Sequence, residues 1–168
     1  MRASRTLVLI VLFVIAVAAA WWFTARMRPA PVGSAITVYY TKADGTTLAP
    51  WQLSLKADSD RLSAAYFAAT QCVAGPPPGV DAVRFPAGTR VLSFDVQGST
   101  ADVDISKEVA SSAEGGFAES AEFKALVWTL TQPRLGIGSV SVRIGGARVA
   151  TLPGGHLELD EPLSRSSF

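Results

Sequence analysis

The sequence has very little of the residue types that most often carry chemistry, with one cysteine and one histidine in 168 residues. A single cysteine cannot form a disulfide within the chain, so the fold must be held by its core alone. Lysine and arginine total 15 against 14 aspartates and glutamates, for a net charge of +1. This balance gives no electrostatic reason to expect a nucleic acid, so we predict none as a partner. The length allows one modest domain and an attachment segment.

Long hydrophobic runs are absent except near the N-terminus. Residues 7–23 contain no charge, proline or glycine, and a helix that crosses a membrane needs about 20 apolar residues, with about 17 as the lower limit. Trp21 and Trp22 stand where aromatic side chains gather at a membrane interface. The pattern predicts cytoplasmic residues 1–5, one transmembrane helix or signal anchor over 6–24, a linker over 25–35, and an extracytoplasmic domain over 36–168.

A cleaved signal peptide is the alternative reading of the same segment. The start is basic, the stretch is apolar, and Ala18 and Ala20 supply small residues before a possible cut ahead of Trp21. The apolar run continues through Phe23, which favours retention as a single-pass anchor in the cell membrane. Both readings place the domain outside the cytoplasm, either tethered or secreted.

The domain alternates between strand and helix patterns. Residues that are apolar or β-branched at every second position predict strands over 36–41, 48–55, 91–97, 100–106, 139–144 and, as a short edge strand, 147–152. Apolar residues at helical spacing predict one helix from the cap at Asp58–Asp60 to Val73 and a second that ends at Gln132. We expect an α+β fold in which two helices pack on one face of a small mixed or antiparallel sheet, preceded by the transmembrane helix.

The stretch VLSFDVQGSTADVDIS, residues 91–106, predicts a β-hairpin with Gly98-Ser99 at a type II′ turn. This register puts the apolar residues of both strands on one face. The predicted apolar pairs are Val96 with Ala101, Phe94 with Val103 and Leu92 with Ile105. A slip of one residue would move these side chains to the solvent face, so the register is well specified.

The other face of this hairpin carries Asp95, Asp102 and Asp104. The register sets Asp95 opposite Asp102, a pair that is mildly unfavourable unless something binds between the carboxylates. We interpret these residues as a solvated face and as a candidate interaction surface for a basic partner. A calcium site would need further oxygen ligands, and paired catalytic carboxylates would need a pocket. We therefore predict no metal, cofactor or catalytic residue here.

Cys72 and His156 are the two remaining candidates for chemistry. The first predicted helix has a continuous apolar stripe formed by Leu62, Ala65, Tyr66, Ala69, Cys72 and Val73. A cysteine on such a stripe packs as a small hydrophobe, so we expect Cys72 in the core rather than as a nucleophile. His156 lies among glycines, leucines and acids in a predicted loop, where a surface or turn role is expected.

Four short motifs follow one another along the domain, and together they resemble the GerMN domain of bacterial sporulation and germination proteins. They are Ala74-Gly75-Pro76, Pro86-Ala87-Gly88-Thr89, Ala101–Ser106 and Thr129–Gln132. The resemblance extends over about residues 36–164. Gly88 would let the chain turn into the hairpin, and the polar side chains at 104–106 would close the next loop by hydrogen bonds. We therefore expect the motifs to serve the backbone geometry of the fold and not a chemical reaction.

The resemblance implies a bacterial envelope protein that acts in spore formation, germination or peptidoglycan-associated assembly, without a catalytic mechanism. It implies an envelope protein or a peptidoglycan-associated partner, and a related fold implies self-association into a homo-oligomer. The chain departs from the better-known members in having one such domain and no cysteine for a lipid anchor. The function expected is that of a membrane-tethered interaction module, and the alternative is a hydrolase or transferase that modifies the cell wall.

Overall fold

The structure is a computed structural model that describes residues 13–23, 35–111, 115–153 and 155–168. Residues 13–23 form a helix with exposed side chains, and the chain divides into two compact units, Met1–Ala30 and Pro31–Phe168. No helix within the described residues is both long enough and apolar enough to span a membrane. Residues 6–12 and 24 of the expected transmembrane segment lie outside the described residues, so that segment stays a prediction.

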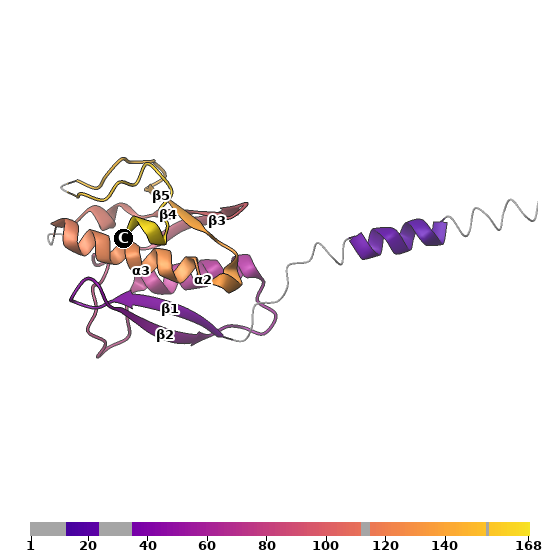
Figure 1. Cartoon of the computed structure of the whole chain (residues 1–168), viewed down its shortest axis with the longest axis horizontal. Coiled ribbons are helices and arrows are strands. Elements are labelled where there is room, and N and C mark those ends of the chain that lie inside the picture. Colours follow the sequence, from indigo (N-terminus) through magenta and orange to yellow (C-terminus); the bar gives the residue numbers. More distant parts are fainter. Residues whose placement is uncertain (1–12, 24–34, 112–114, 154) are drawn as a thin grey trace, which may run out of the picture. The chain divides into compact units, whose positions relative to one another are not determined.

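The second unit is an α+β domain (Figure 1). Its strands and main helices, in chain order, are β1 (Ala35–Thr41), β2 (Leu48–Ser54), α2 (Arg61–Ala74), β3 (Val91–Gln97), β4 (Thr100–Ile105), α3 (Gly115–Leu130) and β5 (Ser139–Ile144). Short 3-10 turns occur at Lys107–Ser111, Pro133–Leu135 and Arg165–Ser167. The predicted strands and helices are confirmed, except that residues 147–152 form no strand. Ala147 makes only an isolated bridge with Ile144.

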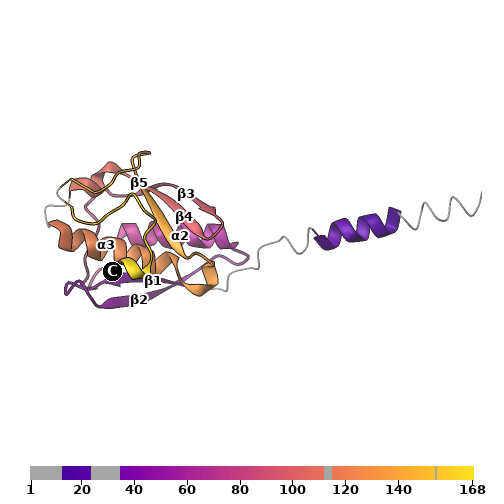
Figure 2. The same ribbon diagram turned by 45° about the horizontal axis from the view of Figure 1, so that its top comes forward.

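The strands form two separate sheets, whereas one sheet was expected. β1 and β2 are an antiparallel pair, and the second sheet has the order β3-β4-β5, with β4 and β5 parallel. Both helices contact β1, while α2 also contacts β3 and α3 also contacts β5. Figures 1 and 2 show the helices as a layer with a sheet on either side. The prediction of helices on one face of a single sheet is therefore wrong.

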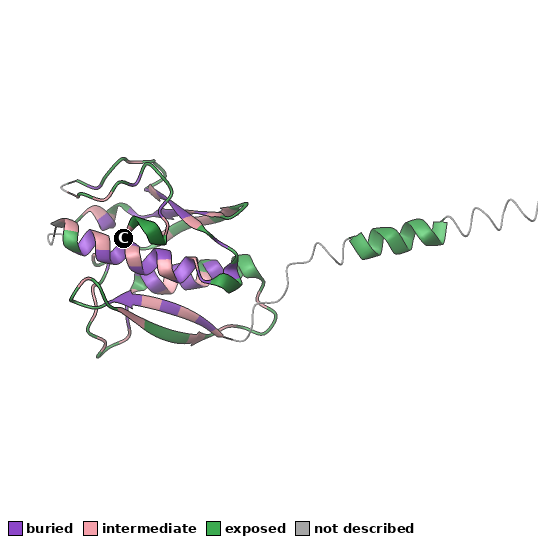
Figure 3. Cartoon of the chain, viewed as in Figure 1, coloured by how far each residue is buried: buried purple, intermediate pink, exposed green. Residues whose placement is uncertain are grey.

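This position between two sheets explains which side chains the helices bury (Figure 3). The buried residues of α2 are small: Ala64, Ala65, Ala68, Ala69, Cys72 and Val73. Leu62 and Tyr66 were expected on the buried stripe, yet they are 48% and 45% exposed. Alanines allow the backbone of α2 to approach its neighbours closely, so the larger apolar residues are turned to its outer side.

The hairpin of β3 and β4 has the predicted register over most of its length. Phe94 pairs with Val103, Val96 with Ala101, and Asp95 with Asp102. Gly98 has a φ of 62°, as the first central residue of a type II′ turn requires. The expected pair of Leu92 with Ile105 is wrong, because an irregularity between Val91 and Ser93 brings Val91 opposite Ile105. Leu92 is consequently 46% exposed.

The end of α3 closes the free side of β1. The Thr129 hydroxyl accepts a hydrogen bond from the backbone nitrogen of Tyr39 at 2.9 Å. The Gln132 side-chain amide donates to the Thr37 carbonyl at 3.0 Å. Both polar side chains are buried, so they supply partners that β1 would otherwise take from another strand. The Thr-Leu-Thr-Gln motif thus has a structural role. Phe117, near the start of α3, is 58% exposed.

Candidate functional site

The outer face of the β3-β4-β5 sheet carries the three predicted aspartates. The face contains a depression of about 340 Å³ lined by Ser93, Phe94, Asp95, Gln97, Asp102, Asp104, Arg143 and Gly146. The alternation of the strands produces this arrangement, because Val103 and Val142 point into the core while their neighbours along β4 and β5 point outward. The apolar-in part of the prediction is confirmed for β4, where Val103 is fully buried, but the prediction of a solvated acidic face is wrong for Asp104, which is buried.

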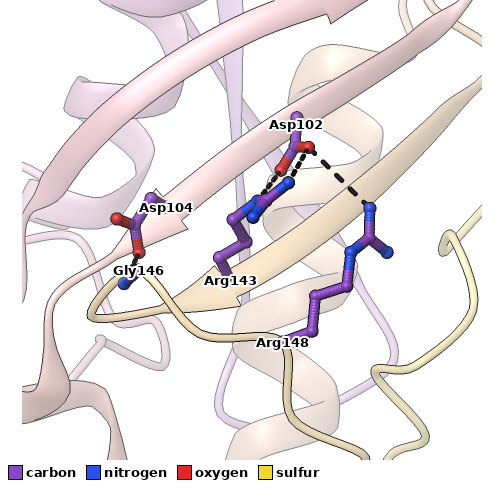
Figure 4. A network of polar contacts seen from close by, with 5 residues as sticks. All are labelled: Asp102, Asp104, Arg143, Gly146 and Arg148. Atoms are coloured by element: carbon purple, nitrogen blue, oxygen red, sulfur yellow. Dashed lines mark hydrogen bonds and ion pairs between the residues drawn. The ribbon is translucent and has the colours of Figure 1, made fainter.

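Asp102 is held by two arginines (Figure 4). The Nε and Nη2 atoms of Arg143 donate to the two carboxylate oxygens of Asp102 at 3.0 and 3.1 Å. Arg148 lies with its Nη2 atom 3.9 Å from Oδ2 of the same carboxylate. The hydrogen bonds to Asp102 raise the pKa of the Arg143 guanidinium. This two-pronged geometry orients both side chains and leaves the Asp102 carboxylate with little capacity for a ligand.

Asp104 has a different role on the same strand. Its Oδ1 atom accepts a hydrogen bond from the backbone nitrogen of Gly146 at 2.9 Å, and only 9% of the residue is exposed. Gly145 and Gly146 have φ values of 58° and 87° and turn the chain just after β5. Asp104 therefore stabilises that turn and is not free to bind a partner.

Asp95 is exposed at the edge of the sheet, so it is the one predicted aspartate whose side chain faces solvent freely. The three aspartates lie together on one face, as predicted, but they do not act alike. Three carboxylates and two guanidiniums share this face, which therefore keeps one net negative charge. No group of three or more metal-ligating side chains occurs among the described residues. The arrangement fits polar contact with a partner better than ion binding.

The lone cysteine is buried, as predicted. Cys72 is 2% exposed, and its Sγ atom lies 3.7 Å from the Tyr39 carbonyl oxygen. Burial raises the pKa of the thiol to about 12, so the nucleophilic thiolate does not form near neutral pH.

His156 is exposed on the C-terminal segment, in accordance with the surface role predicted for it. Its backbone nitrogen donates to the buried carboxylate of Glu119 at 2.9 Å. Glu119 packs against Gly155 so closely that a side chain there would collide with it. A second depression, of about 360 Å³, is lined by His156, Leu157, Glu158, Glu161, Pro162, Leu163 and Ser167.

A surface that sequence reasoning missed lies where α2 meets β3. The ring of Tyr66 packs against that of Phe94, with centroids 6.1 Å apart and planes at 49°. Leu62 lies one turn before Tyr66 on the same side of α2, and Leu92 precedes Phe94 on β3. The sequence did contain a signal for this surface, which is the difference in size among the apolar residues of α2. A helix whose apolar stripe contains both alanines and large residues can bury only its alanines and leave the large side chains exposed.

Solved structures of similar fold include a putative lipoprotein from Clostridium perfringens, with a TM-score of 0.57 and 19% identity over 79% of this chain and 87% of that one, and domains of one sporulation protein. The chain matches the first GerMN domain of the sporulation protein GerM from Bacillus subtilis with a TM-score of 0.62 and 27% identity, covering 79% of this chain and 98% of that one. It matches the tandem GerMN domains of the same protein with a TM-score of 0.60 and 22% identity. That match covers 79% of this chain but only 46% of the tandem structure, so this chain spans about half its length.

No curated protein matches the chain at a significant level. A family model does, over residues 37–150, and its description is "Germane: Sporulation and spore germination". The match includes most of β1 and all of β2 through β5, and with them the hairpin, both main helices and the face that carries the aspartates. Family model and fold agree, and the chain belongs to the Germane, or GerMN, domain family.

Proposed function

We propose that the chain is a non-enzymatic interaction module of the cell envelope, held on the outer side of a membrane by its N-terminal segment. The observation that carries the proposal is that three of the candidate reactive groups are engaged or buried in the structure. Asp102 binds Arg143, Asp104 binds a backbone nitrogen, and the Cys72 thiol is buried with a raised pKa. A catalytic acid, base or nucleophile has to reach its substrate, whereas these groups hold the fold.

The tether rests on the sequence of residues 6–24. Their apolar character and the tryptophans at one end support an anchor that spans the membrane once. The linker over 25–35 would then separate the membrane from the domain. Its eleven residues reach at most about 40 Å when extended, which keeps the domain close to the membrane surface.

The process proposed is spore formation, germination or an assembly associated with peptidoglycan. The family description and the GerM domains support this choice. In each of these settings a domain beside the membrane would bind another envelope protein or a partner attached to the cell wall.

Two measurements test the proposal. The purified full chain is incubated with peptidoglycan, and soluble fragments are measured. No release above background is expected, and release that is lost in His156→Ala would establish the cell-wall enzyme instead.

The tether is tested by separating membranes from soluble material in cells that make the chain. Because Cys72 is buried, a cysteine introduced at Asp160, which is exposed, gives a single accessible thiol. A reagent that cannot cross the membrane should label this cysteine in intact cells, and the chain should fractionate with the membrane. Recovery in the medium as a shortened chain would show that the segment is a cleaved signal peptide.

A further inference from the structure

The two sheets have four lateral edges, and three of them are protected in the described part of the chain. The outer side of β1 is bonded by Thr129 of α3 and by Gln132, two residues after the end of that helix. The outer side of β5 is bonded by Leu163, which exchanges two backbone hydrogen bonds of 2.8 Å with Val140. β2 carries Pro50, which has no backbone N–H to offer an added strand. β3 has no such protection.

The hydrogen-bonding phase of the hairpin shows which groups of β3 are available. In a two-residue hairpin, the residues that flank the turn, here Gln97 and Thr100, form a hydrogen-bonded pair, and the pairs then alternate. Phe94 and Val96 consequently direct their backbone N–H and C=O groups away from β4. No backbone hydrogen bond from these groups to another described segment is present. The edge therefore offers unpaired backbone N–H and C=O groups at Phe94 and Val96, two residues apart.

Apolar side chains lie beside this open ladder. Tyr66 and Leu62 of α2 and Leu92 of β3 are each between 45% and 48% exposed. Phe94 contacts Tyr66 and is partly buried against the core. A strand added to β3 would bring every second side chain onto this apolar surface, because side chains alternate between the two faces of a sheet. Burial of such side chains supplies the affinity that backbone hydrogen bonds alone do not.

The opposite face of an added strand would meet Asp95. Asp102 and Asp104 are engaged within the domain, while Asp95 stands exposed on β3 itself. An opposite charge directly across from Asp95 stabilises the pairing of two strands, and a like charge weakens it. The partner favoured by this edge therefore carries a lysine or an arginine on the face opposite to its apolar residues.

We propose that β3 is the docking edge of the domain and accepts an extended segment of a partner protein in which apolar residues alternate with basic ones. The apolar residues lie against Tyr66 and Leu62, and a basic residue pairs with Asp95. The segment extends the β3-β4-β5 sheet by one strand. This inference deepens the proposed function and rests on it, since it names the surface and the partner chemistry of the interaction module.

The experiment uses the full chain in nanodiscs of zwitterionic lipid, which has no net charge to attract a basic peptide. The probe is a synthetic peptide that matches the seven residues of β3 in length and alternates lysine with valine. Its affinity is measured by fluorescence anisotropy, and backbone hydrogen exchange is followed with residue resolution. Binding is expected to slow the exchange of the Phe94 and Val96 amides about tenfold or more.

Variants and control peptides separate strand addition from attraction by charge. Asp95→Lys should weaken binding by about 2-fold to 30-fold, since it replaces an attractive cross-strand pair by a repulsive one. Asp160→Lys makes the same change of charge on an exposed residue of the C-terminal segment and should leave the affinity unchanged. Tyr66→Ala removes a half-exposed ring that lies outside the buried core, and it should also weaken binding. A peptide methylated on alternate backbone nitrogens should bind at least tenfold more weakly.

Three results would overturn the inference. They are equal loss of affinity in Asp95→Lys and Asp160→Lys, binding without slower exchange at Phe94 and Val96, and no binding of the peptide. Protection of these two amides that depends on protein concentration and needs no peptide would replace the proposed partner by a second copy of the chain. The proposed function fails separately, by release of peptidoglycan fragments or by loss of membrane association, so the two failures can be told apart.

Discussion

Replacing Thr129 by valine should destabilise the domain by leaving the edge of β1 without its partner. Thr129 is fully buried, and its hydroxyl accepts the hydrogen bond of the Tyr39 backbone nitrogen at 2.9 Å. Valine has nearly the same shape but no acceptor. A buried N–H group that loses its partner costs about 1–3 kcal/mol. The free energy of unfolding should therefore fall by about that amount.

The assay is urea unfolding of residues 31–168, which contain every residue of the buried core. A slope of about 2 kcal/mol per molar urea converts the loss into a decrease of about 0.5–1.5 M in the midpoint. The matched control is Thr70→Val, because Thr70 lies on α2, is partly exposed and bonds only the Tyr66 carbonyl of its own helix. Its effect should stay within about 0.5 kcal/mol.

Hydrogen exchange at Tyr39 identifies the cause of the loss. The amide should exchange faster in Thr129→Val and stay protected in Thr129→Ser, which keeps the hydroxyl. Equal midpoints for Thr129→Val and Thr70→Val, or an unchanged Tyr39 exchange rate, would refute the idea that α3 closes the edge of β1.

Three further predictions concern other parts of the domain. Burial raises the pKa of Cys72 from 9.0 to about 12. The contribution of this thiol to stability should therefore be constant below about pH 9 and should fall as pH rises toward 12, because the unfolded chain releases that proton first. Urea midpoints measured across this range should fall less steeply in Cys72→Ala. Gly98→Ala should cost about 1–2 kcal/mol, since its φ of 62° is unfavourable for a residue with a side chain although the space is open, and equal stability in thermal melts would contradict the turn assignment. Leu126→Ala should cost about 2–5 kcal/mol by leaving a cavity in the core, and a calorimetric loss under 1 kcal/mol would show that α3 is not central.

Local patterns were enough to predict most of the elements and most of the hairpin register. The alternation from Phe94 to Val103 identifies both strands, the turn and the face that is buried, because a neighbouring strand joined by two residues has few other registers. The irregularity at Leu92 was not visible, since the apolar residues Val91 and Leu92 are adjacent and either can pair with Ile105.

Contacts between distant segments were not predictable in the same way. The division into two sheets depends on where α2 and α3 lie, and no pattern within β1 or β3 reports that position. It also decides that alanines of α2 are buried while Leu62 and Tyr66 are exposed. The same holds for the candidate site, because Arg143 reaches Asp102 only through the parallel pairing of β4 with β5.

The family resemblance rested on motifs whose contacts are now visible. Thr89 donates to the Pro86 carbonyl at 2.6 Å, and the Ser106 hydroxyl accepts from the Arg90 backbone nitrogen at 3.1 Å. Both bonds lie at the open end of the hairpin, where the chain enters β3 and leaves β4. The motifs describe how the chain turns and leave the partner unspecified, and for that reason they predicted the fold better than the activity.

The closure of β1 by a helix end has a consequence for stoichiometry. A domain with unprotected strands on both flanks can pass its hydrogen-bonding pattern from one copy to the next and grow into a fibre. Here Thr129 and Gln132 at β1, Leu163 at β5 and Pro50 in β2 interrupt the pattern on the other flanks. A segment that adds to β3 therefore cannot be followed by further domains along the same sheet. The resulting complexes are finite, with one added strand for each domain.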